Sequence, residues 1–365
     1  MELRFRQIHL DFHTSGDIPG IAAQFDPDEF ADTLKAAHVD SVTCFARGHH
    51  GYLYYDSKNF PERVHPHLTN KNLLVEQIEA CHKRGIRVPI YITVQWDEFT
   101  GKEHPEWLVL DKEGVVTNGK PYEAGFYQFL ALNSPYVDFL KEQTREVLEM
   151  MPVDGIFFDI VDARDDSSKW TKQGMLALGM NPEDDAQRLA YGEKVVHDFR
   201  NEMTAFVRQF NQDCTIFYNA GNIGPFERGS IDAYSHFELK SLPSGGWGYM
   251  HFPVSMAFAR TLGKDCMGMT GKFHTSWGDF HSFKPQAALR FECMRMLSMN
   301  AKCSIGDQLL PNGKICEYTY ELIGSVYGEV EAKENWIKGA VFRSDIGVLT
   351  VEEFTKERTP RSTSG

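Results

Sequence analysis

Two acidic residues lie in short strand-like segments and could take part in chemistry. Asp159 follows the run GIFF, and in an extended strand its side chain shares a side with that of Phe157. An ionised carboxylate is costly in such surroundings, so we expect Asp159 to have polar partners and to act as a nucleophile or a base. Glu238 lies in HFELK, where His236 and Lys240 point to the same side of the strand. This cluster favours a functional site.

Each acidic residue also has a structural interpretation. Asp159 could instead cap the next loop or pair with Arg164, and Glu238 could form an ion pair with Lys240. Both alternatives predict partners within the same segment of the chain.

Further polar and aromatic residues lie at the carboxyl ends of predicted strands or in the loops that follow them. They are His13, His49, His50, Trp96, Asn219, His236, Trp247, His274 and Trp277. Imidazole and indole rings combine hydrogen-bonding groups with flat apolar faces, which suits a sugar. We therefore predict that these residues bind the substrate.

A metal centre is the weaker interpretation of the histidines. His49 and His50 are adjacent, so on an extended strand they point to opposite faces and cannot easily grip one ion together. No H-E-x-x-H motif occurs, and we predict neither a metal nor another cofactor. The rival enzyme is a metal-dependent barrel hydrolase. Its ligands would be drawn from His13, His49, His236 and His274.

The elements that must position these residues alternate between short apolar runs and helix-length periodic segments. Asp26 and Pro27 predict the start of the first helix, and Gly85 predicts the end of the second. A shorter helix is expected over SMAFARTLG, residues 255–263. Eight such pairs favour an α/β fold of the (β/α)8 TIM-barrel class, with the strand ends gathered at one face. The rival open sheet wants a G-x-G-x-x-G loop, which FHTSGDIPG does not supply.

Composition limits the partners. The 365 residues carry a net charge of −13 with no basic cluster, which argues against nucleic acid as a partner. The seven cysteines form no C-x-x-C pair, and their odd number rules out a complete disulfide framework. No stretch has the length of a signal-peptide core or a membrane span. We expect a cytoplasmic protein without a membrane partner.

The end of the chain differs from the rest. We expect the barrel to occupy residues 1–340. The segment FRSDIGVLTVEEF, residues 342–354, predicts a further strand, and a polar tail follows it. Residues 341–365 are therefore predicted to be the remnant of a C-terminal domain.

Several segments resemble the α-L-fucosidases of glycoside hydrolase families 29 and 151 and their relatives called hypothetical glycosyl hydrolase family 6. The segments are FARGHHGYLYYDSK, DGIFFDIV, YNAGNIG, HFELKSLPSGGWGYMHFP and GKFHTSWGDFHSFKP. The resemblance implies that His49 and His50 match two sugar-binding histidines, that His13 is similar to a third, and that Asp159 matches the nucleophile. Gly48 stands where the family 29 motif has a lysine.

The resemblance implies a retaining exo-glycosidase that acts on a fucosylated or related oligosaccharide, with Asp159 as nucleophile. Glu238 as acid/base is our inference from strand parity, since the family motif does not fix that residue. The relatives continue into a domain that resembles the β-galactosidase trimerisation domain, which is compatible with a homo-oligomer. A sugar-binding barrel without catalytic activity is the rival that is not an enzyme.

Overall fold

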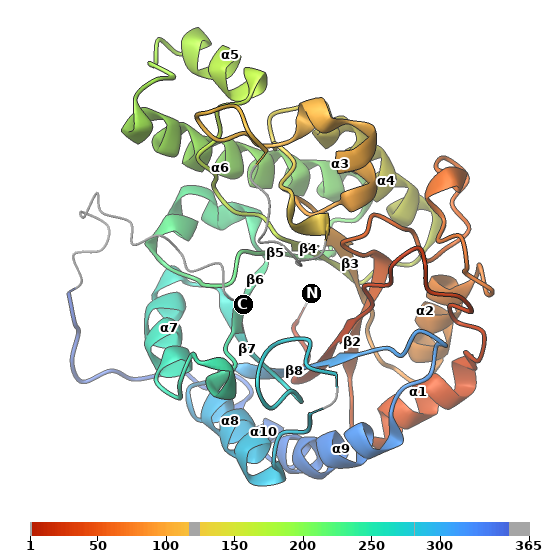
Figure 1. The fold of residues 1–365 in the computed structure, drawn as a ribbon. Coiled ribbons are helices and arrows are strands. Elements are labelled where there is room, and N and C mark those ends of the chain that lie inside the picture. The colour runs from red at the N-terminus through yellow and green to blue at the C-terminus, as the bar shows by residue number, and fades with distance from the viewer. Residues whose placement is uncertain (1, 117–124, 281, 350–365) are drawn as a thin grey trace.

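The computed structural model describes residues 2–116, 125–280 and 282–349. Eight parallel strands surround a central axis, and helices pack around the outside (Figure 1). The predicted (β/α)8 barrel is thereby confirmed.

The strands and helices follow one another in the predicted alternation. The strands are β1 (Arg6–Asp11), β2 (Ser41–Arg47), β3 (Pro89–Thr93), β4 (Gly155–Asp159), β5 (Thr215–Asn219), β6 (His236–Lys240), β7 (Asp265–Gly271) and β8 (Lys302–Gln308). The helices are α1 (Pro27–Ala36), α2 (Leu73–Lys83), α3 (Glu98–Glu103), α4 (Tyr136–Met150), α5 (Lys169–Ala177), α6 (Asp185–Phe210), α7 (His251–Ala259), α8 (Gln286–Ser298), α9 (Glu317–Glu331) and α10 (Glu334–Ile337).

The sheet is nearly closed. Its hydrogen-bonded order is β5-β4-β3-β2-β1-β8-β7-β6, and every recorded strand pair is parallel. Between β5 and β6, the backbone N–H of Ser235 donates to the carbonyl of Ile216 at 3.0 Å. This contact brings the two ends of the sheet together. Because the strands are parallel, the carboxyl ends of all eight lie on the same side of the barrel.

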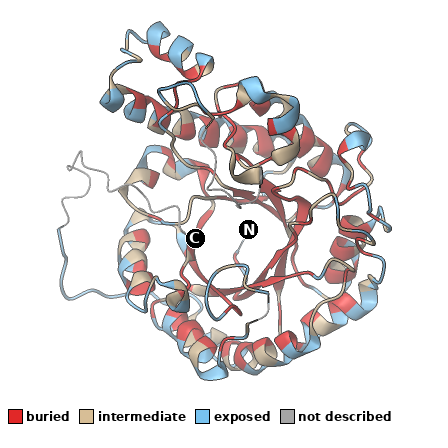
Figure 2. Cartoon of the chain, in the orientation of Figure 1, coloured by how far each residue is buried: buried red, intermediate tan, exposed pale blue. Residues whose placement is uncertain are grey.

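Local sequence signals account for the helix boundaries. The Asp26 carboxylate accepts hydrogen bonds from the backbone N–H groups of Asp28 and Glu29, which caps α1 as predicted. Gly85 follows α2 with φ +73°, the left-handed conformation that ends a helix most easily with glycine. The longer helices bury one face and expose the other (Figure 2), while the short α10 has no buried residue.

The structure corrects three local predictions. Helix α7 begins at His251, four residues before the predicted start, because Pro253 is tolerated in the first turn. Two unpredicted helices, α3 and α5, lie in the loops after β3 and β4. They begin where Asp97 and Ser168 accept backbone hydrogen bonds from Thr100 and from the third residue of α5.

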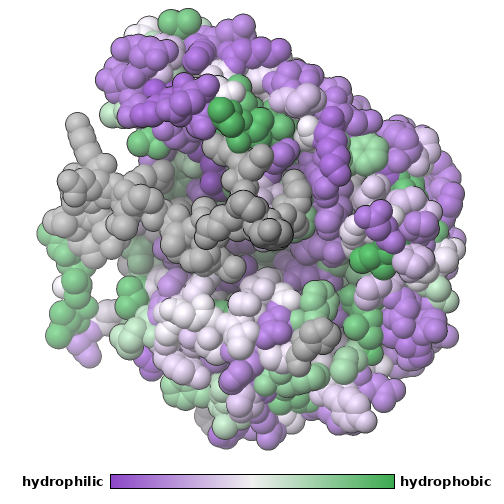
Figure 3. All heavy atoms as spheres, viewed as in Figure 1, coloured by the Kyte–Doolittle hydropathy of each residue, from purple (hydrophilic) through white to green (hydrophobic). Residues whose placement is uncertain are grey.

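Residues 341–349 form no helix or strand, so the strand predicted at residue 342 does not begin within the described part of this segment. Ile346, Val348 and Leu349 are exposed. On the face of the molecule drawn in Figure 3, hydrophilic residues cover much of the upper and right-hand rim, with smaller hydrophobic areas between them. Residues 350–365 lie outside the described residues. The division into a barrel and a C-terminal remnant stays a prediction. No described helix combines the length and apolar character that crossing a membrane requires.

Candidate active site

Asp159 closes β4 at the carboxyl face of the barrel, and two neighbouring strands hold its carboxylate. The Tyr91 hydroxyl donates to Oδ2 at 2.5 Å from β3, and the Asn219 amide donates to Oδ1 at 2.7 Å from β5. Burial and the nearby Asp159 charge raise the pKa of Tyr91 well above its ordinary value, so the phenol stays a donor. Asp159 thus has the polar partners that its apolar strand predicts, and they come from other strands.

The residues that follow Asp159 turn away from it. Arg164 lies 3.6 Å from the Asp162 carboxylate, and no ion pair between Arg164 and Asp159 is recorded in the described structure. Ile160 adopts φ +58°, a left-handed conformation that a β-branched residue rarely takes. Such strain costs about 1–3 kcal/mol and is typical of functional sites. Here it sets the direction of the backbone directly after Asp159.

His13 and His49 stack beside this carboxylate. Their ring centroids lie 3.9 Å apart with an angle of 15° between the planes, and His49 Nε2 lies 3.9 Å from Asp159 Oδ2. The Thr93 hydroxyl donates to the Trp96 carbonyl, so His49 Nδ1, 2.8 Å from that hydroxyl, must be the donor in its contact with Thr93. The neutral His49 ring therefore turns the Nε2 lone pair toward Asp159.

His13 has the opposite tautomer. Its Nδ1 accepts from the backbone N–H of His49 at 3.0 Å, which leaves the proton on Nε2. Burial is the main reason that the pKa values of both histidines are well below the ordinary value, and each is lowered further by neighbouring imidazoles. The stacked pair therefore offers one N–H donor and one nitrogen acceptor to a ligand at neutral pH.

Asp11 and Trp277 extend the site beyond His13, whose Nε2 lies 3.8 Å from Asp11 Oδ1. The Trp277 indole N–H donates to Asp11 Oδ2 at 2.8 Å, and His9 Nε2 lies 3.2 Å from Asp11 Oδ1. The indole packs so closely on Gly306 that a Cβ there would lie 2.2 Å from the ring. The position after β7 and the absent side chain in β8 therefore bring Trp277 over the barrel mouth.

Lys240 is the site residue that the sequence indicated least clearly. Its Nζ lies 4.3 Å from the centroid of the Trp277 ring, and the described residues offer it neither a hydrogen-bond acceptor nor a carboxylate within ion-pairing distance. Burial lowers the pKa of Lys240, while Asp159 and Asp11 act in the opposite direction. A partly buried cation without an acceptor points to a ligand oxygen as its partner.

Trp96 forms the side of the site next to His49. Its ring centroid lies 5.0 Å from that of His49 and 5.9 Å from that of Phe126. The indole N–H is buried and has no acceptor among the described residues. An unpaired donor beside the histidines again fits a ligand hydroxyl.

Glu238 and His236 lie deeper in the barrel. Glu238 Oε1 is 3.0 Å from His236 Nε2, and Oε2 accepts from the Gln7 amide at 3.1 Å. Gln7 is near the amino end of β1, so the Glu238 side chain faces the lower layers of the interior. The described structure records no contact of Glu238 with Asp159 or with Lys240. The structural alternative of a Glu238–Lys240 ion pair is therefore not seen, and the pairing of Glu238 with Asp159 stays a prediction.

Three of the predicted binding residues lie apart from Asp159. His50 Nδ1 contacts Glu98 Oε2 at 2.6 Å. Both His49 and His50 lie in the turn after β2, not on an extended strand as expected. Trp247 packs on His251 with centroids 4.7 Å apart, and His274 is exposed in the loop after β7. Within residues 2–116, 125–280 and 282–349, no group of three or more potential ligands is arranged to hold a metal ion.

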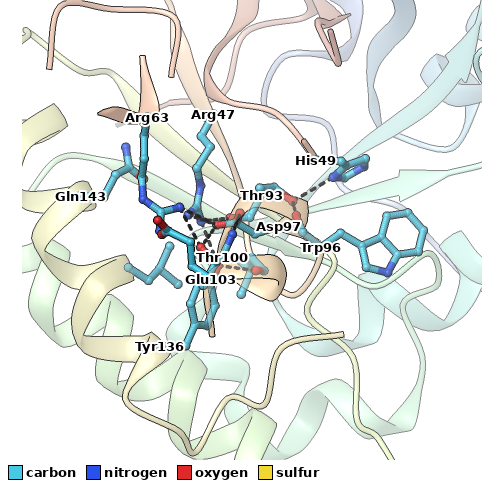
Figure 4. Close-up of polar contacts among 12 residues, drawn as sticks. Arg47, His49, Arg63, Thr93, Trp96, Asp97, Thr100, Glu103, Tyr136 and Gln143 are labelled. Carbon is cyan, nitrogen blue, oxygen red and sulfur yellow. Dashed lines mark hydrogen bonds and ion pairs between the residues drawn. The ribbon is translucent and has the colours of Figure 1, made fainter. Parts of the chain in front are cut away.

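A buried ion pair supports the His49 side of the site (Figure 4). Arg47 donates to Asp97 Oδ2 at 2.6 Å, to the Thr93 carbonyl at 2.6 Å and to the Tyr136 hydroxyl at 2.9 Å. The Thr100 hydroxyl donates to the same Asp97 oxygen at 2.6 Å. Because Thr93 also contacts His49, this network ties the end of β2 to the loop that carries Trp96.

Comparison with known proteins identifies similar sequences and folds. Residues 26–160 match the family described as hypothetical glycosyl hydrolase 6. The α-L-fucosidase isoenzyme 2 from Paenibacillus thiaminolyticus is 42% identical and superposes with a TM-score of 0.91 over 96% of the chain. The chain is thus similar in sequence and fold to this α-L-fucosidase. It spans 53% of the length of that enzyme.

More distant structures share the fold alone. The α-L-fucosidase isoenzyme 1 from the same organism is 15% identical, with a TM-score of 0.57 over 92% of this chain and 74% of its own. A β-galactosidase from Marinomonas ef1 is 12% identical, with a TM-score of 0.61 over 92% of this chain and 60% of its own. No match was found among curated proteins.

Proposed function

We propose that the barrel is a retaining, exo-acting glycoside hydrolase that releases a terminal α-L-fucose from an oligosaccharide. The observation that carries the proposal is the Asp159 carboxylate, held by Tyr91 and Asn219 at the barrel mouth beside two stacked neutral histidines. The similarity of the whole chain to the Paenibacillus thiaminolyticus fucosidase supports fucose as the sugar.

In the proposed first step, an Asp159 oxygen attacks the anomeric carbon and forms a glycosyl ester while the leaving oxygen takes a proton. The Tyr91 and Asn219 donors fix the carboxylate without neutralising it, since both are uncharged. His49 Nε2 accepts from a sugar hydroxyl and His13 Nε2–H donates to one. In the second step, water activated by the acid/base residue breaks the ester and the configuration at the anomeric carbon is retained.

Two carboxyl groups are candidates for the proton transfer. Glu238 was inferred from strand parity, and its contacts with His236 and Gln7 turn it toward the interior. Asp11 lies at the carboxyl end of β1, within 3.8 Å of His13, at the level of the other site residues. A retaining mechanism needs the two carboxyl groups about 5–5.5 Å apart, a requirement that favours a donor at the barrel mouth.

Hydrolysis of an aryl α-L-fucoside tests the proposal. Asp159→Asn should lower kcat by about 10⁴-fold or more because no nucleophile remains, while the exposed Asp213→Asn, made in the same way, should change nothing. The first product observed by NMR should be the retained anomer. An Asp159→Asn enzyme with normal turnover, or fucose binding by a wild-type protein that never hydrolyses, would overturn the proposal. An inverted product would overturn double displacement alone.

The same assay separates the two proton donors. The responsible variant, Glu238→Gln or Asp11→Asn, should lose more activity on a fucoside with a poor leaving group than on one with a good leaving group. A good leaving group needs little protonation. Equal losses on both substrates would assign that residue a structural role.

A further inference from the structure

A polar cleft of about 310 Å³ opens beside the candidate active site. It lies between the loops that follow β1 and β2 and the helix α3, and therefore on the same face as Asp159. The residues that line it are Ser15, Gly16, Asp17, His50, Tyr52, Glu98, Phe99, Lys102 and Glu103. Ligand pockets range from about 300 to 1,000 Å³, so this cleft has room for a single sugar unit.

The cleft and the site share a wall. His50 lines the cleft, while its neighbour in sequence, His49, faces Asp159. The Phe126 ring packs against both, with centroids 5.0 Å from His50 and 5.3 Å from His49. A ligand that extends from the Asp159 site into the cleft therefore passes only the short stretch of the loop after β2 that carries the two histidines.

Ion pairs and hydrogen bonds hold the charged side chains of the cleft in place. Glu98 bridges two cations or donors, with Oε2 2.6 Å from His50 Nδ1 and Oε1 2.7 Å from Lys102 Nζ. Lys102 remains 72% exposed, so its other N–H bonds are open to a ligand. Asp17 adds a further carboxylate, whereas that of Glu103 is paired with Arg63 Nη2 at 3.0 Å. The excess of negative charge favours a neutral hydroxylated ligand over an anionic one.

Aromatic rings supply the flat surface that a sugar ring needs. Tyr52 and Phe99 meet edge to face with centroids 5.8 Å apart. The Tyr52 hydroxyl has no recorded hydrogen-bond partner among the described residues. It lies against Gly16, where a Cβ would come within 2.4 Å of the hydroxyl oxygen. Gly16 thus lets the Tyr52 side chain take this place beside the β1 loop.

We propose that this cleft binds the leaving group of the reaction, as a neutral pyranose joined to the fucose that Asp159 attacks. The inference rests on the proposed function and adds the substrate class: a fucosylated neutral sugar, with Lys102 and the Tyr52 hydroxyl as hydrogen-bonding groups and Phe99 as a stacking surface. One neutral pyranose fits the volume of the cleft and its net negative charge. The wall shared with the Asp159 site lets this pyranose be joined to the fucose.

The test compares two substrates on the same 365-residue chain: an aryl α-L-fucoside and a disaccharide of fucose and a neutral hexose. Lys102→Met should lower the ratio of kcat/KM for the disaccharide to kcat/KM for the aryl fucoside by about tenfold or more, since a charged hydrogen bond is lost. Tyr52→Phe should lower it by about two- to tenfold. Lys194→Met is the matched control, because Lys194 forms an equivalent ion pair with Asp198 at 2.6 Å on the exposed face of α6.

The outcomes separate the two proposals. A wild-type chain that cleaves the aryl fucoside, with ratios that neither variant changes, would overturn the inference and leave the proposed function intact. Equal losses on both substrates would also overturn it, because they would show an effect through His50. A wild-type chain that cleaves no fucoside would overturn both. A uronic acid in place of the hexose should be cleaved more slowly, and equal rates would refute the preference for a neutral sugar.

Discussion

The buried Arg47–Asp97 pair should contribute far more to stability than an exposed pair of the same length. Both side chains are fully buried, and Arg47 Nη1 lies 2.6 Å from Asp97 Oδ2. Arg47→Met removes the cation and leaves the carboxylate with Thr100 and with Arg63, whose Nη1 is 3.7 Å away. Leaving a buried charge without its main partner costs about 3–5 kcal/mol, so we expect a loss of that size in the free energy of unfolding.

Arg290→Met provides the control. Arg290 Nε also lies 2.6 Å from a carboxylate, that of Glu329, but the Arg290 side chain is 56% exposed. Exposed pairs contribute little because water and salt screen them, so the stability of this variant should lie close to that of the wild type. Urea unfolding followed by circular dichroism gives both values. Equal losses in the two variants, or a loss below about 1 kcal/mol for Arg47→Met, would refute the argument from burial.

Two further predictions concern Lys240 and His65. Lys240→Met should lower kcat/KM for an aryl fucoside by about 10- to 100-fold, because a charged hydrogen bond to the substrate is lost. The urea midpoint should not fall, since the described residues offer Lys240 no ion-pair partner that would be left without its cation. A large loss of stability with normal kcat/KM would contradict this prediction. Burial lowers the pKa of His65 to about 4, so the unfolded chain takes up this proton first, and stability that is complete above pH 6.5 is lost as the pH falls toward 4. Between pH 7 and pH 5 the His65 contribution amounts to about 2 kcal/mol, and His65→Gln should remove that part of the pH dependence in urea unfolding, whereas an unchanged slope would assign it to other groups.

The hydrophobic periodicity of the segments and the capping residues at their ends predicted most of the fold. The apolar strands and amphipathic helices alternate clearly, and caps such as Asp26 mark their ends locally. A closed barrel then brings residues at strand ends together without further information, which is why His13, His49 and Asp159 could be identified from strand position. These signals are short-range, and the barrel closure follows from their repetition.

The sequence pattern could not predict how deep along the barrel axis a side chain such as that of Glu238 lies. Alternation in a strand tells which side Glu238 faces, and it leaves the level of the side chain open. That level follows from the stagger between β6 and β1, which brings Glu238 to Gln7. Loop positions fail for a similar reason. His274 and Trp247 lie where contacts distant in sequence place their loops, and no local pattern encodes those contacts.

The left-handed backbone at Ile160 has a consequence for engineering. Glycine would adopt φ +58° without this strain, but it would also remove the packing of the Ile160 side chain on Val109, Phe129 and Ala131 and give the unfolded chain more freedom. The same exchange would widen the angular range of the acidic group one residue earlier. A substitution at position 160 should therefore be judged by its catalytic rate as well as by its thermal stability, because the strain, the packing and the placement of the carboxylate all change at once.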